Sequence, residues 1–254
     1  MFTSPELCVR IIKKKKGGRI VRLDKFLSIS GVATRREAEK AARAGRILVN
    51  GLPERDSARQ IDPVADMVVF DGEKIEYHEN YYIMLNKPEG YVSATADRRE
   101  PTVLELLPER LQRLALFPCG RLDKDTTGLL LLTDNGTLAH RLLSPRRQVE
   151  KKYRFVCQIP VSDEGKAALE GGVVLDDGYR TLPAKLELDA GRRSGIITIH
   201  EGKYHQIKRM FGSIGNRILC LERISFGPLS LDPALPCGGW RYLSPDEVAQ
   251  LESL

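Results

Sequence analysis

The residue best suited to covalent or acid-base chemistry is Asp123, one of four charged residues between positions 121 and 125. Residues 129–132 are all leucine, and a glycine and a Thr-Asp-Asn-Gly turn bound them, which predicts a buried strand just after the charged segment. In an extended segment Arg121 and Asp123 share a face, and neighbouring cations would keep the carboxylate ionised. An ionised carboxylate on a rigid support could act as a nucleophile or a base; the alternative is a salt bridge within the loop.

The sequence around Asp123 resembles the active-site motif of the pseudouridine synthases. The matching residues are Gly-Arg-Leu-Asp at 120–123 and Thr-Thr-Gly-Leu-Leu-Leu-Leu-Thr-Asp-Asn-Gly at 126–136. The resemblance is strongest to the branch that modifies ribosomal RNA and carries a small N-terminal RNA-binding domain. It implies that Asp123 is the catalytic residue.

Length and composition indicate a soluble protein with either one large domain or a small and a medium one. The chain has 254 residues, 42% of them hydrophobic and 29% charged, which suffices for a self-contained core. No apolar run reaches the roughly 18 to 20 residues that cross a bilayer, so no membrane association is expected. No signal-peptide core precedes the lysine run at 13–16, and we expect a cytoplasmic protein.

Cysteine and histidine usage predicts neither a disulfide framework nor a metal site. The five cysteines are scattered and never form a Cys-x-x-Cys pair, and no two of the four histidines stand at helical ligand spacing. Glycine-rich nucleotide-binding motifs are also absent from the sequence.

The positive charge is concentrated near the N-terminus. Residues 1–78 hold 16 Lys and Arg against 11 Asp and Glu, a net of +5, while residues 79–254 hold 24 against 23, a net of +1. A basic module beside a nearly neutral one is typical of a domain that docks on a polyanion, although a solvated surface with a basic tail is the alternative.

Residues 1–20 are predicted to form a poorly ordered basic arm, and residues 21–78 a small α+β domain. Thr34-Arg-Arg-Glu37 forms a capping-box sequence, which predicts a helix that runs to Ala44. With the segments Arg-Leu-Asp-Lys-Phe-Leu at 22–27 and Ile-x-Val-Asn-Gly at 47–51, this pattern resembles the alpha-L RNA-binding motif. The resemblance implies that the basic face of the helix contacts RNA; an ordinary solvated face is the alternative. The basic residues are Arg35, Arg36, Lys40 and Arg43.

Residues 79–254 are expected to form the catalytic domain, which begins with a strand at 81–85 and an Asn-Lys-Pro-Glu-Gly turn found in the same synthase branch. Between 150 and 159 apolar and polar residues alternate, which predicts a strand carrying Tyr153. The resemblance makes Tyr153 the aromatic side chain beside the target uracil, whereas a simple core role is the alternative. The fold that the family resemblance implies is a mixed, mainly antiparallel sheet with flanking helices, in the α+β class.

The segment 201–211 is predicted to continue into a helix whose apolar stripe includes Ile207. Lys208 and Arg209 flank this stripe, close enough to reach a buried partner. In related synthases a basic residue at the position of Lys208 pairs with the catalytic aspartate, and Arg209 remains the alternative partner. Arg121, Ile207 and Arg209 are further candidates for substrate contacts.

Together these resemblances imply an enzyme that isomerises uridine to pseudouridine in ribosomal RNA, needs no cofactor and acts as a monomer. The sequence Tyr-His-Gln-Ile-Lys-Arg-Met at 204–210 resembles the branch acting on small-subunit 16S RNA, often termed RsuA-type. A large-subunit 23S enzyme and a noncatalytic ribosome-assembly factor are the alternatives. A glycosidase using Asp123 and Asp125 is disfavoured, because two carboxylates on one loop do not face each other across a bond.

Overall fold

The computed structural model describes residues 20–254, which divide into two compact units. The first contains the described residues up to Tyr81 together with 107–116, and the second contains 82–106 and 117–254. The basic arm predicted for residues 1–20 therefore lies, except for Ile20, outside the described residues. Within residues 20–254 no helix combines the length and the apolar character needed to cross a membrane.

The N-terminal segment of the first unit forms two helices, α1 (Leu23–Ile29) and α2 (Arg35–Arg43), and two small antiparallel sheets with the strand orders β1-β4 and β3-β2-β5-β6. The predicted capping box is confirmed, because the Glu37 amide donates to Thr34 Oγ1 and the Thr34 amide donates to Glu37 Oε2. The short helix α3 (Glu109–Gln112) belongs to this unit too. The strands are β1 (Val21–Arg22), β2 (Ile47–Val49), β3 (Leu52–Pro53), β4 (Gln60–Ile61), β5 (Val68–Phe70) and β6 (Glu73–Ile75).

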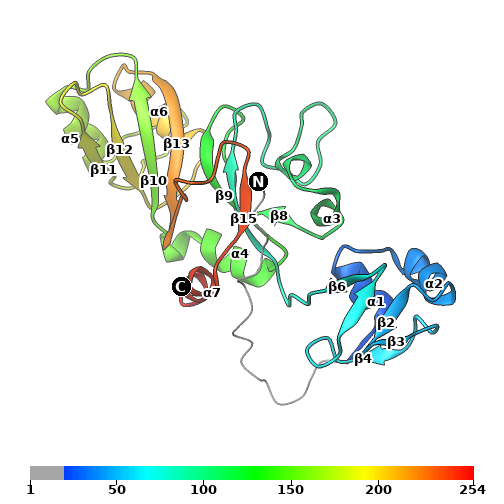
Figure 1. The fold of residues 1–254 in the computed structure, drawn as a ribbon. Helices are drawn as coiled ribbons and strands as arrows, with labels where there is room; N and C mark the ends of the chain where they lie inside the picture. The colour runs from blue at the N-terminus through cyan, green and yellow to red at the C-terminus, as the bar shows by residue number, and fades with distance from the viewer. Residues whose placement is uncertain (1–19) are drawn as a thin grey trace. The chain divides into compact units, whose positions relative to one another are not determined.

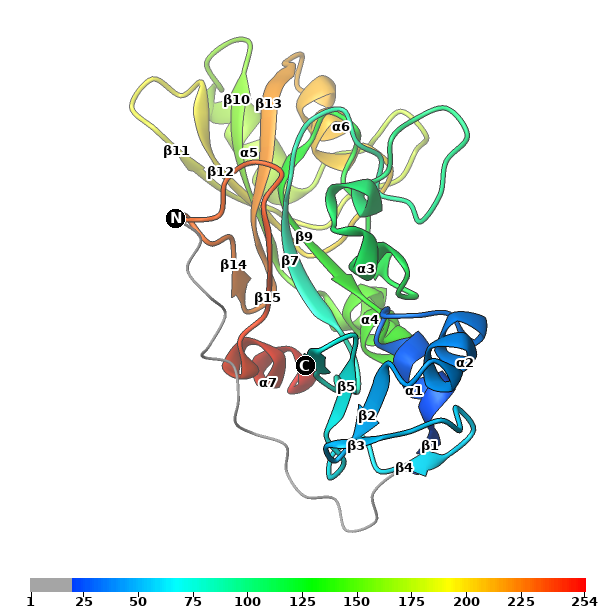
Figure 2. The ribbon, with the colours of Figure 1, turned by 45° about the vertical axis from the view of Figure 1, so that its right-hand side comes forward.

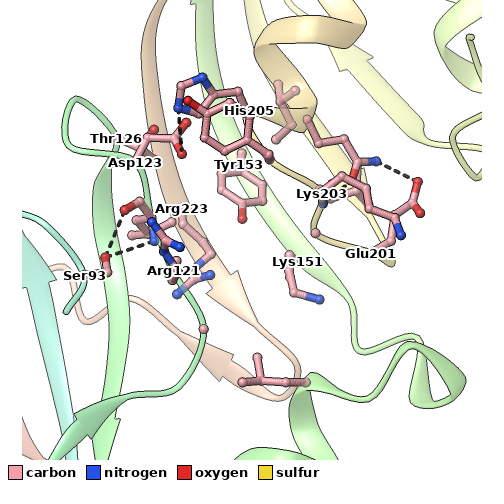
Figure 3. Close-up of a pocket in the computed structure, with 18 of the residues that line it drawn as sticks. Ser93, Arg121, Asp123, Thr126, Lys151, Tyr153, Glu201, Lys203, His205 and Arg223 are labelled. Carbon is pink, nitrogen blue, oxygen red and sulfur yellow. Dashed lines mark hydrogen bonds and ion pairs between the residues drawn. The ribbon is translucent and has the colours of Figure 1, made fainter. Parts of the chain in front are cut away.

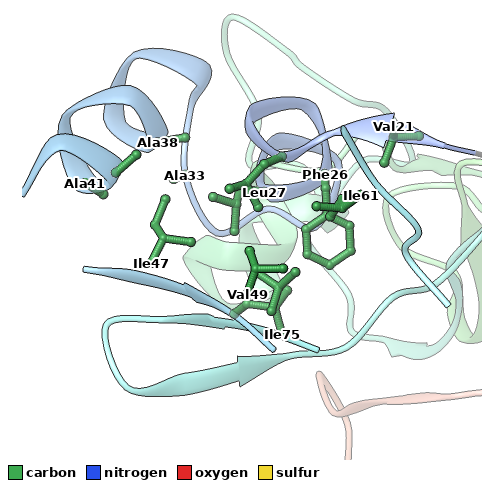
Figure 4. Packing of buried hydrophobic residues seen from close by; sticks show 13 residues of the cluster. Val21, Phe26, Leu27, Ala33, Ala38, Ala41, Ile47, Val49, Ile61 and Ile75 are labelled. Carbon is green, nitrogen blue, oxygen red and sulfur yellow. The ribbon is translucent and has the colours of Figure 1, made fainter. Parts of the chain in front are cut away.

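The core of the first unit lies between helices α1 and α2 and one face of the larger sheet (Figure 4). Helix α2 contributes only small side chains to it, Ala38, Ala41 and Ala42, all fully buried. Small residues let a helix approach the neighbouring backbone closely, and the larger side chains of α1, Phe26 and Leu27, fill the remaining space. The outer face of α2 is left to its charged residues.

The second unit is built on a nine-stranded sheet with the order β11-β12-β10-β13-β9-β7-β15, to which β14 adds at β13 and β8 at β9 (Figures 1 and 2). Every strand pair is antiparallel except β13 with β9. The predicted mixed, mainly antiparallel α+β fold is confirmed. The strands are β7 (Tyr82–Lys87), β8 (Phe117–Pro118), β9 (Thr127–Thr133), β10 (Lys151–Cys157), β11 (Lys185–Leu188), β12 (Ser194–Ile199), β13 (Ile218–Phe226), β14 (Leu229–Ser230) and β15 (Trp240–Tyr242).

Helices cover the sheet at separate places. α4 and α7 pack on a buried cluster that includes Leu129, Leu131 and Phe226, whereas α6 lies beside β13 (Figure 1). The helices of this unit are α4 (Gly136–Leu143), α5 (Asp163–Gly171), α6 (Gln206–Ser213) and α7 (Pro245–Glu252), with 3-10 turns η1 (Val103–Leu106) and η2 (Pro145–Arg147).

The parallel pair β9–β13 brings the two halves of the sheet together at Gly128. This glycine has φ of +97°, and a Cβ atom there would lie 2.3 Å from the carbonyl oxygen of Arg223. Only a residue without a side chain fits such a close approach. The strand that follows Asp123 is thereby fixed against β13.

Candidate active site

A cleft of about 1020 Å³ opens in the second unit, beside the loop that joins β8 to β9 (Figure 3). The leucines of β9 are fully buried, so this loop emerges from a rigid strand as expected. Several residues predicted from the sequence line the cleft. They are Arg121, Asp123, Tyr153, Ile207 and Lys208.

Asp123 lies between two cationic or potentially cationic side chains from α6 and the turn before it. Lys208 Nζ is 3.0 Å from Asp123 Oδ2, and His205 Nε2 is 3.6 Å from Asp123 Oδ1. The carboxylate is 27% exposed, so it remains open to a ligand in the cleft. A carboxylate held in this way is available for attack or for proton abstraction.

Lys208 also contacts the second carboxylate of the loop, Asp125. Burial opposes the charged form of both groups, but their mutual hydrogen bond and attraction prevail: the pKa of Lys208 is raised and the pKa of Asp125 is lowered. The ammonium group of Lys208 therefore stays protonated and partly offsets the negative charge of two carboxylates.

Arg209 has other partners. Its guanidinium binds Asp176 and Asp177, with 2.7 Å between Arg209 Nη2 and Asp177 Oδ2. Of the two basic residues that the sequence left open, Lys208 is therefore the one that contacts Asp123. Arg209 instead anchors the loop containing Asp176 and Asp177 to α6.

Tyr153 and Ile207 are buried side chains that project into the cleft from β10 and α6. Tyr153 is 7% exposed, and its ring lies on the cleft side of the sheet (Figure 3). Together with Ile207 it presents an apolar surface next to the Asp123 carboxylate, suited to a planar base. Arg121 is exposed, and within residues 20–254 no carboxylate forms an ion pair with it.

Sequence reasoning missed the residues that hold the Asp123 loop in place. Lys87 is fully buried, and its ammonium group donates to the carbonyls of Pro88, Lys124 and Thr126 at 3.0, 3.2 and 2.8 Å. The Ser93 hydroxyl donates to the carbonyl of Leu122 at 2.9 Å. The available signal was the Asn-Lys-Pro-Glu-Gly turn at 86–90, which identified a turn but not the contacts of its lysine.

The turn before α6 was missed as well: the segment 201–211 was predicted to continue into a helix, whereas the helix begins only at Gln206. His205 adopts a left-handed conformation with φ of +46°, and its ring stacks on Tyr204 with 3.8 Å between the ring centroids. Tyr204 is 73% exposed. The Glu201 carboxylate accepts a hydrogen bond from Gln206 at 2.7 Å, which ties the turn to the helix.

The four basic residues predicted to contact RNA all lie exposed on α2 in the first unit, whereas the cleft lies in the second. They are Arg35, Arg36, Lys40 and Arg43. In the described part of the chain no group of three or more His, Cys, Asp or Glu side chains is placed to hold a metal ion.

Two family patterns match the sequence and divide it much as the structure does. The S4 domain matches residues 21–68, and the RNA pseudouridylate synthase family matches residues 81–213.

Similarity to individual proteins extends over nearly the whole chain. An uncharacterized RNA pseudouridine synthase of Bacillus subtilis, YtzG, is 45% identical over 90% of this chain and 97% of its own length. The ribosomal small subunit pseudouridine synthase A of Escherichia coli is 40% identical over 91% of this chain and 100% of its own length.

A crystal structure of a pseudouridylate synthase, 38% identical, covers 91% of this chain and 99% of its own with a TM-score of 0.65. The matched patterns and these full-length similarities agree with the fold. The chain belongs to the RNA pseudouridine synthase family and carries an N-terminal S4 domain.

Proposed function

We propose that the protein converts a specific uridine of small-subunit 16S ribosomal RNA to pseudouridine, with Asp123 as the catalytic residue. The choice of 16S RNA is supported by the relatives named small subunit pseudouridine synthase A, which are about 40% identical over their full length. The choice of Asp123 rests on one observation: its carboxylate faces the cleft while Lys208 Nζ holds it at 3.0 Å.

The reaction breaks the bond between uracil N1 and ribose C1′ and makes a bond between C5 and C1′. Asp123 starts it, either by attack on C1′ or by removal of a ribose proton. The uracil then turns within the cleft, the C5 proton is lost after the new bond forms, and N1 gains a proton. The net change is an isomerisation, so the scheme needs no oxidant and no group donor.

Three side chains have distinct roles in this scheme. Lys208 places a positive charge beside the Asp123 carboxylate and orients it toward the cleft. Tyr153 stacks on the uracil after it is detached from the sugar, and Ile207 closes the apolar side of the pocket. A uridine within a stacked helix cannot reach such a pocket, so the target nucleotide must be flipped out or already single-stranded.

RNA docking is assigned to the S4 domain. The exposed cations of α2, Arg35, Arg36, Lys40 and Arg43, are available to phosphates because none of them is buried in the core of the first unit. Such contacts supply affinity and orientation, while the cleft selects the reacting nucleotide.

The test uses 16S and 23S transcripts, with assembling ribosomal particles as a second set of substrates. Pseudouridine is mapped by primer-extension stops after carbodiimide treatment. The variant Asp123→Asn removes the proposed nucleophile or base, and Asp246→Asn, an exposed carboxylate on α7, is the matched control.

A new stop in 16S RNA that Asp123→Asn abolishes and Asp246→Asn retains supports the proposal. Stops in 23S RNA alone would overturn the substrate while keeping the reaction. No stop in any substrate would leave an RNA-binding factor without catalysis, and release of free uracil would indicate a glycosidase.

A further inference from the structure

Two cationic side chains, Lys151 and Arg223, line the cleft, and the proposed reaction does not use them. Lys151 begins β10, and Arg223 lies on the neighbouring strand β13, directly opposite Tyr153 in the ladder. Opposed residues of an antiparallel pair point to the same face of a sheet, as do residues two apart on one strand. Both cations therefore share the cleft face with Tyr153 (Figure 3).

Both cations lie near the ring of Phe226. Lys151 Nζ is 5.6 Å and Arg223 Cζ 5.1 Å from the centroid of this ring. Between the pairs Lys152–Ser225 and Tyr153–Arg223 strand β13 has one extra residue, a β-bulge. Because of this bulge, Arg223 and Phe226 face the same side although they are three residues apart. Two like charges are thus held in one corner of the cleft.

No negative group of the described chain neutralises this corner. Arg223 is only 2% exposed; its Nε donates to the Leu129 carbonyl at 2.8 Å, and its Nη2 is buried without a hydrogen-bond partner. Lys151 Nζ donates to the Val149 carbonyl at 2.7 Å. Within residues 20–254 neither side chain has a carboxylate within ion-pair distance, and a buried cation without a partner is costly.

Two cations and one carboxylate, Glu201, act on one another here, so the net charge of the corner stays positive. Burial and the charge of Arg223 lower the pKa of Lys151 to about 8, with Cys119 and Glu201 acting in the opposite direction. Burial raises the pKa of the Cys119 thiol to about 11, so that group is neutral at physiological pH. The Glu201 carboxylate already accepts hydrogen bonds from Tyr179, Leu182 and Gln206.

We propose that Lys151 and Arg223 form a phosphate-binding subsite, which holds one backbone phosphate of the RNA strand that presents the target uridine. The inference rests on the proposed function, because it takes RNA as the ligand of this cleft. A guanidinium fork and an ammonium point charge are the usual protein partners of a phosphate. Since Lys151 is two residues from Tyr153, the subsite lies next to the ring that is proposed to stack on the uracil. It anchors the RNA strand while the base turns.

The test measures binding of the 16S transcript between 50 and 300 mM salt, in an Asp123→Asn background that prevents turnover. Lys151→Met keeps the length of the side chain and removes its charge. The control is Lys152→Met, because Lys152 is the next residue of the same strand, pairs with Glu150 at 3.3 Å and does not line the cleft.

Lys151→Met is expected to weaken binding about tenfold at low salt and to lower the slope of log K against log salt by about 0.7 to 0.9, whereas Lys152→Met does neither. In the active background kcat/KM for the RNA falls by about the same factor as the binding does. Equal binding by Lys151→Met and the unsubstituted chain overturns the subsite. So does a fall in the saturated rate with unchanged binding, which would assign the cations to the departing uracil instead.

A second experiment is independent of how well the variants fold. In a synthetic RNA centred on the mapped uridine, each phosphate near that uridine is replaced in turn by a neutral methylphosphonate. One replacement is expected to weaken binding to the unsubstituted chain but not to Lys151→Met. If the same losses occur with both proteins, the subsite is wrong. Absence of RNA binding by every protein would instead count against the proposed function.

Discussion

The ammonium group of Lys208 lies 3.0 Å from Asp123 and also contacts Asp125, so one lysine compensates two carboxylates on the same loop. Replacing it leaves two negative charges close together with only His205 beside them. Because the opposing charge of Lys208 both orients Asp123 and balances the loop, this pair is the most sensitive point of the proposed mechanism.

Lys208→Met is expected to lower kcat about 100-fold or more, since an oriented, charge-compensated carboxylate is lost at the reacting atom. Lys208→Arg restores a cation on the same helix and should recover much of the rate. Single-turnover conversion of the mapped uridine measures both effects. Arg209→Met is the matched control, because its partners are Asp176 and Asp177; an equal loss there would contradict the assignment of Lys208.

Lys87 is expected to control both stability and rate through the loop it holds. Lys87→Met removes hydrogen bonds to three carbonyls and should destabilise the protein by about 1–3 kcal/mol, measured by urea unfolding. The rate should fall as well, because the Asp123 loop loses its anchor. Lys124→Met breaks only an exposed ion pair with Glu100 and should leave stability nearly unchanged.

Gly128 should tolerate no side chain. Gly128→Ala places a methyl group 2.3 Å from the Arg223 carbonyl at a backbone φ that alanine disfavours, so a loss of more than about 3 kcal/mol is expected. Gly136→Ala has open space around the added atom and a negative φ, and it serves as the control in the same unfolding series.

Stability should depend on pH through Lys151. Its pKa is about 8 in the folded protein against an ordinary value of 10.5, because burial and Arg223 disfavour the charged form. Between these values the unfolded chain binds more protons than the folded one, so this group makes the free energy of unfolding rise with pH. The measurement is the difference between the unsubstituted chain and Lys151→Met across pH 7.5 to 10.5. A difference that is flat with pH would show that Lys151 is not desolvated.

The α2 cations are expected to act on RNA affinity alone. The double variant Arg36→Gln/Lys40→Gln should weaken binding of the 16S transcript about tenfold and lower its salt dependence, while the saturated rate is unchanged. Arg55→Gln, an exposed residue of the same unit outside α2, is the control. A fall in the saturated rate would mean that the helix does more than dock the RNA.

Local sequence patterns predicted much of the fold. The capping box at Thr34 and Glu37 located the start of α2 because both partners lie within one turn, and the leucine run predicted β9 because its length and boundaries suit a buried strand. The parallel pairing of β9 with β13 could not be predicted, since it depends on contacts between distant segments and leaves no local pattern.

The site was predictable to a similar extent. The motif made Asp123 the candidate catalytic residue, but helical spacing placed Lys208 and Arg209 equally well beside it. What decides between them is a competing loop, Asp176 and Asp177, that takes up Arg209. Lys151 and Arg223 escaped notice because neither belongs to a charged cluster in the sequence; strand pairing places both near the Phe226 ring.

The pairing of β9 with β13 has a consequence for the order of folding. Arg223 and Leu129, joined by a hydrogen bond, are 94 positions apart, so β9 stays unpaired along one edge until most of the chain has been made. The β9 edge at Thr127 and Gly128 can be paired only after β13 has left the ribosome. A nascent or truncated chain ending before Ile218 would expose an apolar strand edge, a template for aggregation, and could not modify RNA.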